Sequence, residues 1–467
     1  MTFQAQANAT RPHSPHSHPN KNFPPRAKAA LQAGVVGNWV DNIHMFLPVI
    51  ALAPALEVLA GPAASATTGA GAGSAVVIAM LLGRPVGGLV FGRISDKWGR
   101  TRTTRLALLG TAVCAAAIAL VPTHQVWGVW TFVAVVAARF VGGVFIAGEY
   151  SAAIPLAMEW SPPRLRGWFS GLILSMAPWA QASIAFATAM MLSLLGPDAY
   201  AVWGWRVLFA FAALASLGMY VFYRFYVEDS APAHLGKHAQ RAAHQRAGRV
   251  VDVVAGPFAG RFWQIFVLLS GLWCMTVATV LVLPAHVGSA AASASNTASG
   301  SATATNAGLD AGAIALAMGV ASVAQALAMA VLGHVSTRLG RRRFFMAWAV
   351  LAGTVGVAAW WCAVSASSFG AAAAWAAVAQ VATVSAYGPV AAYTSEAFPA
   401  RVRSTGYGVA YSFSLILPML YPLWLPVVSD VVGAQVSVVA VLCVGALLVG
   451  VGAALGPAQR SVEELAR

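Results

Sequence analysis

The sequence predicts an all-α membrane protein with twelve transmembrane helices in two pseudo-symmetric bundles of six. The chain is 59% hydrophobic and only 9% charged, whereas a soluble domain carries roughly 25% charged residues. Its charged residues form short clusters between apolar stretches, each long enough for the about 20 residues that span a bilayer. Two motifs also occur twice, once in each half of the chain. Together these observations exclude a soluble fold.

The twelve predicted spans fall into two sets of six. The first set lies at roughly 31–56, 75–94, 104–122, 128–157, 166–194 and 203–226, and the second at roughly 263–285, 309–332, 344–364, 369–392, 403–427 and 430–455. This pattern divides the chain into a disordered tail (1–30), a first bundle (31–227), a basic linker (228–262), a second bundle (263–455) and a polar tail (456–467).

The repeated motifs indicate that the two halves are copies of one unit. Gly92–Arg100 reads GRISDKWGR and returns 241 residues later as GHVSTRLGR at Gly333–Arg341. Glu159–Arg166 reads EWSPPRLR and returns 237 residues later as EAFPARVR at Glu396–Arg403. Two unrelated motifs at nearly one offset are typical of two-halved transporters.

The positions of lysine and arginine predict the orientation. Of the 28 basic residues, 25 fall in segments that share one side of the membrane with both termini. The other three, Arg84, Arg139 and Arg206, lie within spans or at a span end. Because basic loops stay on the cytoplasmic side, we expect a multi-pass plasma (inner) membrane protein with both termini inside. Nucleic acid is therefore not expected as a partner, despite the net charge of +14.

The stretch from Gly92 to Arg102, G-R-x-x-D-K-x-G-R-x-R, closely resembles the loop between the second and third helices of major facilitator superfamily transporters. The preceding Arg84-Pro85-x-Gly87-Gly88 is similar to the metabolite:proton symporter branch. The resemblance covers about residues 31–455. It implies two six-helix bundles that rock around a central cavity, and proton-driven transport of a small polar metabolite such as a carboxylate, keto acid or betaine.

The first span contains two ionisable residues near the membrane midplane, Asp41 and His44. Their i,i+3 spacing puts them on one helix face, where they either exchange a proton or neutralise each other or an arginine. The matching family segment usually reads G-N-x-x-E-W-Y-D-F. Here Asp41 stands at the Glu position and His44 at the Asp position, and the aromatic pair is missing. This departure makes the family's usual substrate a poor guide.

Three more charged residues lie within predicted spans and are functional candidates because such groups are costly in a bilayer. Arg84 either binds the anionic group of a substrate, or holds the Asp41 charge until the substrate arrives, or forms a permanent buried ion pair. Arg139 resembles the family's fourth-span arginine and is expected to face the cavity. Glu149 is a second proton-carrier candidate, or forms a salt bridge with Arg84 or Arg139.

Neutral polar residues complete the predicted cavity, either as ligands or as packing contacts: Asn38, Gln325, Gln380, Tyr387, Tyr393 and Tyr411. Tyr387-Gly388-Pro389 predicts a broken helix there. The resemblance also implies a cytoplasmic gate network of Asp96, Arg100, Glu159, Arg166, Glu396 and Arg403. In the second repeat Thr337 replaces the aspartate, which predicts a weaker latch.

The sequence offers little support for other functions. It shows no nucleophile–base spacing, zinc motif or phosphate loop, so we expect no enzyme activity, no cofactor and no metal. Expected partners are a small-molecule substrate, protons and the lipid bilayer, with the chain as a monomer. A drug/proton antiporter is disfavoured by the two mid-membrane arginines. A non-transporting sensor is disfavoured because no folded domain is appended.

Overall fold

The computed structural model describes residues 24–61, 71–229, 250–284, 286–287, 305–366 and 368–457. Within these ranges the chain is helical and contains no strand. Most of the predicted tails 1–30 and 456–467 and most of the predicted linker 228–262 lie outside the described residues. The first helix begins at Pro25, ahead of the predicted boundary at residue 31. Proline fits the first helical turn because no helical bond needs its missing N–H.

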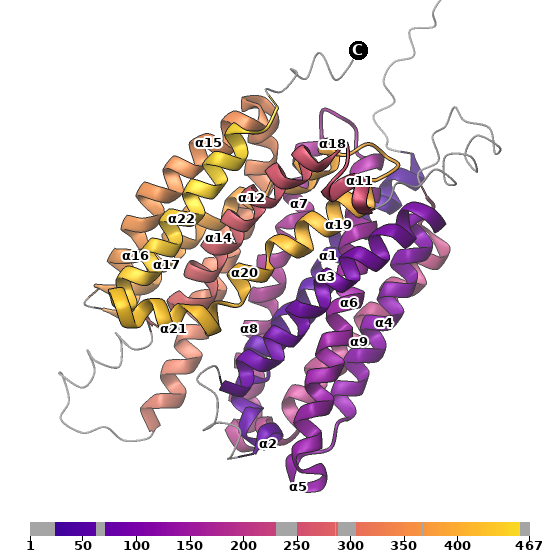
Figure 1. The fold of residues 1–467 in the computed structure, drawn as a ribbon. Helices are drawn as coiled ribbons and strands as arrows, with labels where there is room; N and C mark the ends of the chain where they lie inside the picture. The colour runs from indigo at the N-terminus through magenta and orange to yellow at the C-terminus, as the bar shows by residue number, and fades with distance from the viewer. Residues whose placement is uncertain are drawn as a thin grey trace, which may run out of the picture.

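The first bundle is built from the helices coloured indigo to magenta in Figure 1. Its long helices are α1 (Pro25–Ile50), α3 (Gly71–Trp98), α4 (Arg100–Leu120), α6 (Val129–Trp160), α7 (Arg166–Leu174) with α8 (Met176–Ala199), and α9 (Trp205–Phe225). Short segments join them: η1 (Ala53–Ala55), α2 (Leu56–Ala60), α5 (His124–Trp127) and η2 (Tyr200–Gly204). Helix α3 packs on α6, and α4 packs on both α6 and α9.

The second bundle repeats this plan. Its elements are α12 (Ala259–Thr276) with η3 (Val277–Val282), α14 (Thr305–Leu339), α15 (Arg341–Leu351) with η4 (Ala352–Gly356) and α16 (Val357–Val364), α17 (Phe369–Val384) with η5 (Ser385–Tyr387) and α18 (Val390–Ala397), α19 (Arg403–Ser414) with α20 (Ile416–Met419) and α21 (Tyr421–Val432), and α22 (Ala434–Ala454). The short α11 (Val250–Val254) precedes it. The prediction of two helical bundles is confirmed.

The helices are long and apolar enough to cross a membrane. Among the described residues, nine helices pass this test by length and composition, or ten if the pair α19–α20 and α21, bent by 41°, counts as one span. One of the nine, Arg166–Phe225, covers two predicted spans. The predicted break at Tyr387-Gly388-Pro389 lies between α17 and α18.

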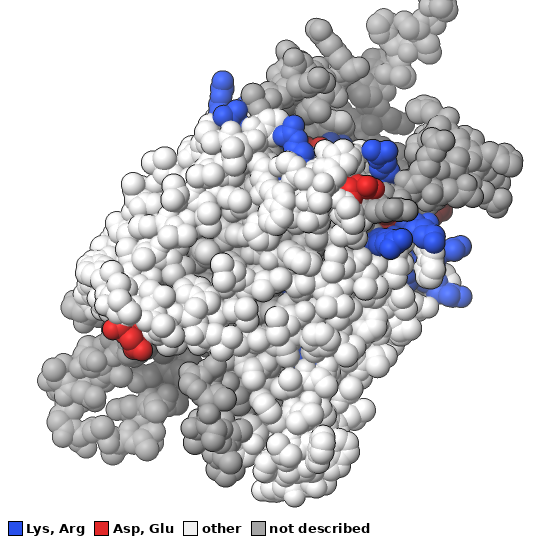
Figure 2. All heavy atoms as spheres, in the orientation of Figure 1, with Lys and Arg blue, Asp and Glu red and all other residues white. Residues whose placement is uncertain are grey.

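Lys and Arg side chains gather at one end of the described surface, and acidic atoms are also visible at the opposite end, as Figure 2 shows. We call the end with the Lys and Arg side chains the basic end; there α3 meets α4, α6 meets α7, α14 meets α15, and α18 meets α19. Helices α2, α5 and α21 lie toward the opposite end (Figure 1). The two bundles meet along two seams. In the first seam α3 and α6 contact α19, and in the second α7 and α8 contact α14.

Candidate functional site

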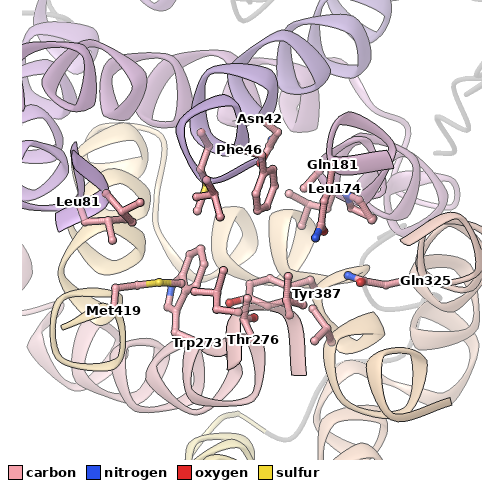
Figure 3. A pocket seen from close by; sticks show the side chains of 18 of the residues that line it. Asn42, Phe46, Leu81, Leu174, Gln181, Trp273, Thr276, Gln325, Tyr387 and Met419 are labelled. Atoms are coloured by element: carbon pink, nitrogen blue, oxygen red, sulfur yellow. The ribbon is translucent and has the colours of Figure 1, made fainter. Parts of the chain in front are cut away.

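A cavity lies between the two bundles and is lined by residues from both (Figure 3). Most of its wall is apolar. The polar groups come from Asn42, Tyr150 and Gln181 of the first bundle and from Trp273, Thr276, Gln325, Tyr387 and Tyr411 of the second. No Lys, Arg, Asp or Glu belongs to the described lining. A concave, mostly apolar site with a few polar groups suits a small molecule.

Four aromatic residues join the bundles at this cavity; we call Tyr150, Trp273, Tyr387 and Tyr411 the aromatic cluster. The rings of Tyr150 and Tyr411 stack with centroids 5.0 Å apart. The indole of Trp273 meets the rings of Tyr387 and Tyr411 edge-on, each at 5.5 Å. The Trp273 Nε1 and the Tyr387 hydroxyl are buried without a hydrogen-bond partner in the described chain. Such groups are rarely left unpaired, so both are available to a ligand.

Two glutamines approach each other across the cavity. Gln181 on α8 and Gln325 on α14 turn their amide nitrogens toward one another in Figure 3. The Gln325 Oε1 accepts a hydrogen bond from Gln380 Nε2 at 2.6 Å, and Gln380 also donates to Ser322 at 3.3 Å. This support leaves the Gln325 NH₂ group on the cavity side. Gln181 was missed at the sequence level; its signal was a lone amide in an apolar span.

Arg84 and Asp41 lie directly behind the aromatic cluster. The Arg84 side chain is fully buried, with its guanidinium carbon 4.8 Å from the Tyr150 ring centre and 5.6 Å from that of Tyr411. Its Nε and Nη2 atoms and the Asp41 Oδ1 atom have no hydrogen-bond partner in the described chain. The two charges interact electrostatically, but no ion pair joins them among the described residues. Neither side chain faces lipid.

His44, Arg139 and Glu149 lie inside the first bundle and do not line the cavity. The His44 Nε2 is 2.7 Å from the Ser216 hydroxyl, and Glu149 accepts a hydrogen bond from Thr111 at 3.2 Å. Arg139 donates to the His44 carbonyl at 2.8 Å. Within the described ranges, no salt bridge joins Glu149 to either arginine. The five charged candidates therefore form two groups, Asp41 with Arg84, and His44 with Arg139 and Glu149.

Other predicted cavity residues make helix contacts. Asn38 donates to the Ile173 carbonyl at 2.6 Å and so ties α1 to α7. The Tyr393 hydroxyl accepts a hydrogen bond from Gln264 at 2.8 Å. Neither Asn38 nor Tyr393 lines the cavity. The neighbouring Asn42 does line it, and its amide donates to the Tyr150 hydroxyl at 2.8 Å. Tyr387, Tyr411 and Gln325 lie at the cavity, with Gln380 behind Gln325.

At the basic end, Asp96 of α3 caps a helix of the opposite bundle. Its carboxylate accepts hydrogen bonds from the backbone amides of Ser404, at 3.1 Å, and Thr405, at 2.8 Å, in the first turn of α19. A carboxylate is favourable there because these amides have no partner within their own helix. A Cβ atom on Gly92 would lie 2.9 Å from the Thr405 Cα, so the close approach requires glycine.

Two glutamates hold one arginine from each bundle. Glu159 pairs with Arg100 of its own bundle and Arg403 of the other. Glu396 pairs with Arg341 of its own bundle at 2.9 Å and Arg166 of the other at 3.7 Å. The six predicted gate residues therefore meet here, joined by Arg341, which the sequence placed in a repeat but not in the gate. The second seam lacks the carboxylate cap, and the Thr337 hydroxyl is buried without a described partner.

Two helical bundles that share a cavity, with nine or ten candidate membrane spans among the described residues, are the architecture of a membrane transporter. The sequence profile of the Major Facilitator Superfamily matches residues 42–299 and 287–465, and the chain belongs to this superfamily. It is a multi-pass membrane transporter, not an enzyme.

Curated relatives are similar over part or most of the chain. The proline/betaine transporter of Escherichia coli K12 is 24% identical over 85% of this chain and 77% of its own length. The glycine betaine/proline/ectoine/pipecolic acid transporter OusA of Dickeya dadantii is 28% identical over 56% of this chain, and the match spans 52% of OusA. The shikimate transporter of E. coli K12 is 28% identical over 55% of this chain and 58% of its own length.

Solved structures share the fold. The proton:xylose symporter XylE has a TM-score of 0.69 at 14% identity, covering 91% of this chain and 94% of XylE. The human organic anion transporter MFSD10 has a TM-score of 0.61 at 17% identity, covering 92% of this chain and all of its own.

Proposed function

We propose that the chain carries a small, carboxylate-bearing metabolite across the plasma membrane together with a proton, by alternating access. The main observation in support of this proposal is the position of Asp41 and Arg84. Both are buried behind an uncharged cavity, and the described chain holds them without an ion pair. The relatives include transporters of betaine, proline and shikimate, which supports a small polar metabolite as the substrate.

The orientation follows from the charge distribution. We place the basic end, and with it both termini, in the cytoplasm, because basic loops stay on that side. The Asp96 cap and the two glutamate–arginine clusters close the basic end between the bundles. The structure then represents a conformation shut toward the cytoplasm, with the cavity to be reached from the opposite end.

Electrostatics in the membrane interior supply the coupling. The Arg84 charge can be balanced by the Asp41 carboxylate or by a substrate carboxylate; both together would leave one uncompensated negative charge in a low-dielectric site, which is costly. Binding of the anion therefore requires that Asp41 takes up a proton. The amides of Gln181 and Gln325 are placed to donate to the substrate, and the aromatic cluster covers its apolar part.

Transport by purified protein in proteoliposomes tests this proposal. Proline, glycine betaine and shikimate serve as first probes, after a thermal-shift screen of metabolite anions, since a ligand raises apparent stability. Acidifying the outside should drive accumulation. Asp41→Asn should abolish accumulation and leave exchange of labelled for unlabelled substrate. Uptake that ignores an imposed pH gradient would contradict proton symport.

A further inference from the structure

A continuous chain of four side chains crosses the first bundle; we call His44, Ser216, Thr111 and Glu149 the relay. The His44 Nε2 is 2.7 Å from the Ser216 Oγ. The Ser216 Oγ is 3.5 Å from the Thr111 Oγ1, which is 3.2 Å from the Glu149 Oε1. The Thr111 hydroxyl also lies 3.0 Å from the Leu108 carbonyl, so its hydrogen must turn away from that carbonyl to complete the relay. The members come from α1, α9, α4 and α6, and none is more than 3% exposed.

The relay is separate from the substrate cavity, because none of its members lines it. In the described chain Glu149 meets no cationic partner; its hydrogen bond comes from a hydroxyl. An unpaired carboxylate in the membrane interior is costly. The positive charge nearest the opposite end of the relay is Arg139, which donates to the His44 carbonyl at 2.8 Å and interacts with Cys114 on α4. Other buried ionisable groups on the surrounding helices include Asp41 on α1, Arg84 on α3, Tyr150 on α6 and Tyr223 on α9.

We propose that the relay binds one proton, which moves between Glu149 and His44, at a site distinct from the substrate cavity. In the shift, the Glu149 carboxylic acid donates to Thr111, Thr111 donates its own proton to Ser216, and Ser216 donates to the His44 Nε2. Three O–H bonds break, and two O–H bonds and one N–H bond form. The products are a carboxylate and an imidazolium, with both hydroxyls restored.

The charge balance explains why such a proton can leave. With the proton bound, the relay is neutral overall whichever end holds it. Without the proton it carries one negative charge, which Arg139 balances from the His44 end. The same positive charge opposes an imidazolium at His44, so the bound proton rests mainly at the Glu149 end. This inference does not need the proposed symport, since proton binding by the relay requires neither Asp41 nor substrate.

Infrared difference spectroscopy of the purified full-length protein tests the inference without a substrate. A pH titration in H₂O and D₂O reports the C=O stretch of protonated carboxylic acids. We expect one such band to disappear in Glu149→Gln and to persist in Asp41→Asn, the matched control for a second buried carboxyl group. Monodisperse elution of each variant establishes that it is folded.

Two further variants keep Glu149 and interrupt the relay. Thr111→Val removes the hydroxyl that bonds Glu149 at nearly constant volume, and should move the C=O band to higher frequency. Ser216→Ala leaves that bond intact and should change only the pH at which the band titrates. A spectrum unchanged by Glu149→Gln would overturn the inference, as would a band whose frequency and titration ignore both interrupting variants.

Discussion

At the scale of single residues, an amide group that faces the cavity is held in its orientation by a hydrogen bond from a side chain behind it. Gln380 donates to the Gln325 Oε1 at 2.6 Å, so it positions the NH₂ group that faces Gln181 (Figure 3). Gln325→Leu should weaken binding of the substrate by about tenfold or more, since a hydrogen bond to a charged group contributes about 1.5–3 kcal/mol. Gln380→Leu should also weaken it, because the Gln325 amide then loses its 2.6 Å bond and keeps only the 3.5 Å contact with the Met329 Sδ. Dissociation constants from calorimetry measure both.

Ser322→Ala is the control, because it removes the 3.3 Å contact behind Gln380 and a bond to the Met318 carbonyl within α14, neither of which involves Gln325; its effect should be the smallest of the three. Equal affinities in all variants would show that Gln325 is a packing residue.

The residue scale is also where the sequence predicted least. The i,i+3 spacing of Asp41 and His44 placed both on one helix face, but their partners come from elsewhere: His44 bonds Ser216, 172 residues away. Asp41 and Arg84 were recognisable because charges stand out in apolar spans. Gln181 was not, since a single amide serves packing as readily as binding. Side-chain partners depend on helix rotation, which hydropathy does not encode.

At the scale of elements, the two seams differ in one position. Asp96 caps α19 across the first seam, and the repeat equivalent in the second seam is Thr337, next to Gly167 in the first turn of α7. Thr337→Asp should place a carboxylate against the backbone amides of the first turn of α7 and so stabilise the closed basic end. A capping carboxylate contributes about 0.5–2 kcal/mol. We expect slower transport, with Thr337→Val as the control.

Labelling of a buried seam cysteine reports the same change independently of transport. The Thr405 side chain is buried and its hydroxyl has no described partner, so Thr405→Cys keeps the backbone cap of Asp96. Labelling from the basic end should slow in the Thr337→Asp background and quicken with Asp96→Asn. Labelling that is insensitive to both changes would mean that these caps do not govern the seam.

At the scale of the whole molecule, the sequence predicted the architecture well, because hydropathy marks the spans and two motifs repeat at nearly one offset. The motifs that resemble the family named Glu159 and Glu396 as gate residues, and each of the two glutamates pairs with two arginines at the basic end. The motifs left Arg341 out of the gate, although it is the counterpart of Arg100, because the second copy of its motif is degenerate. The cavity needed the structure, since its wall is contributed by helices of both halves.

Alternating access predicts that transport requires the two bundles to separate at the basic end. The hydroxyl oxygens of Ser95 on α3 and Ser404 on α19 are 3.2 Å apart across the first seam, so the sulfur atoms of cysteines at these two positions would lie close to each other, as a disulfide requires. Oxidising Ser95→Cys/Ser404→Cys should lock the basic end closed. Transport in proteoliposomes should then fall to background and return on reduction, while substrate binding from the opposite end persists. Each single cysteine variant, treated with the same oxidant, controls for the native cysteines. Full transport with the cross-link in place would show that the basic end need not open, and the bundles would not rock as the closed seams imply.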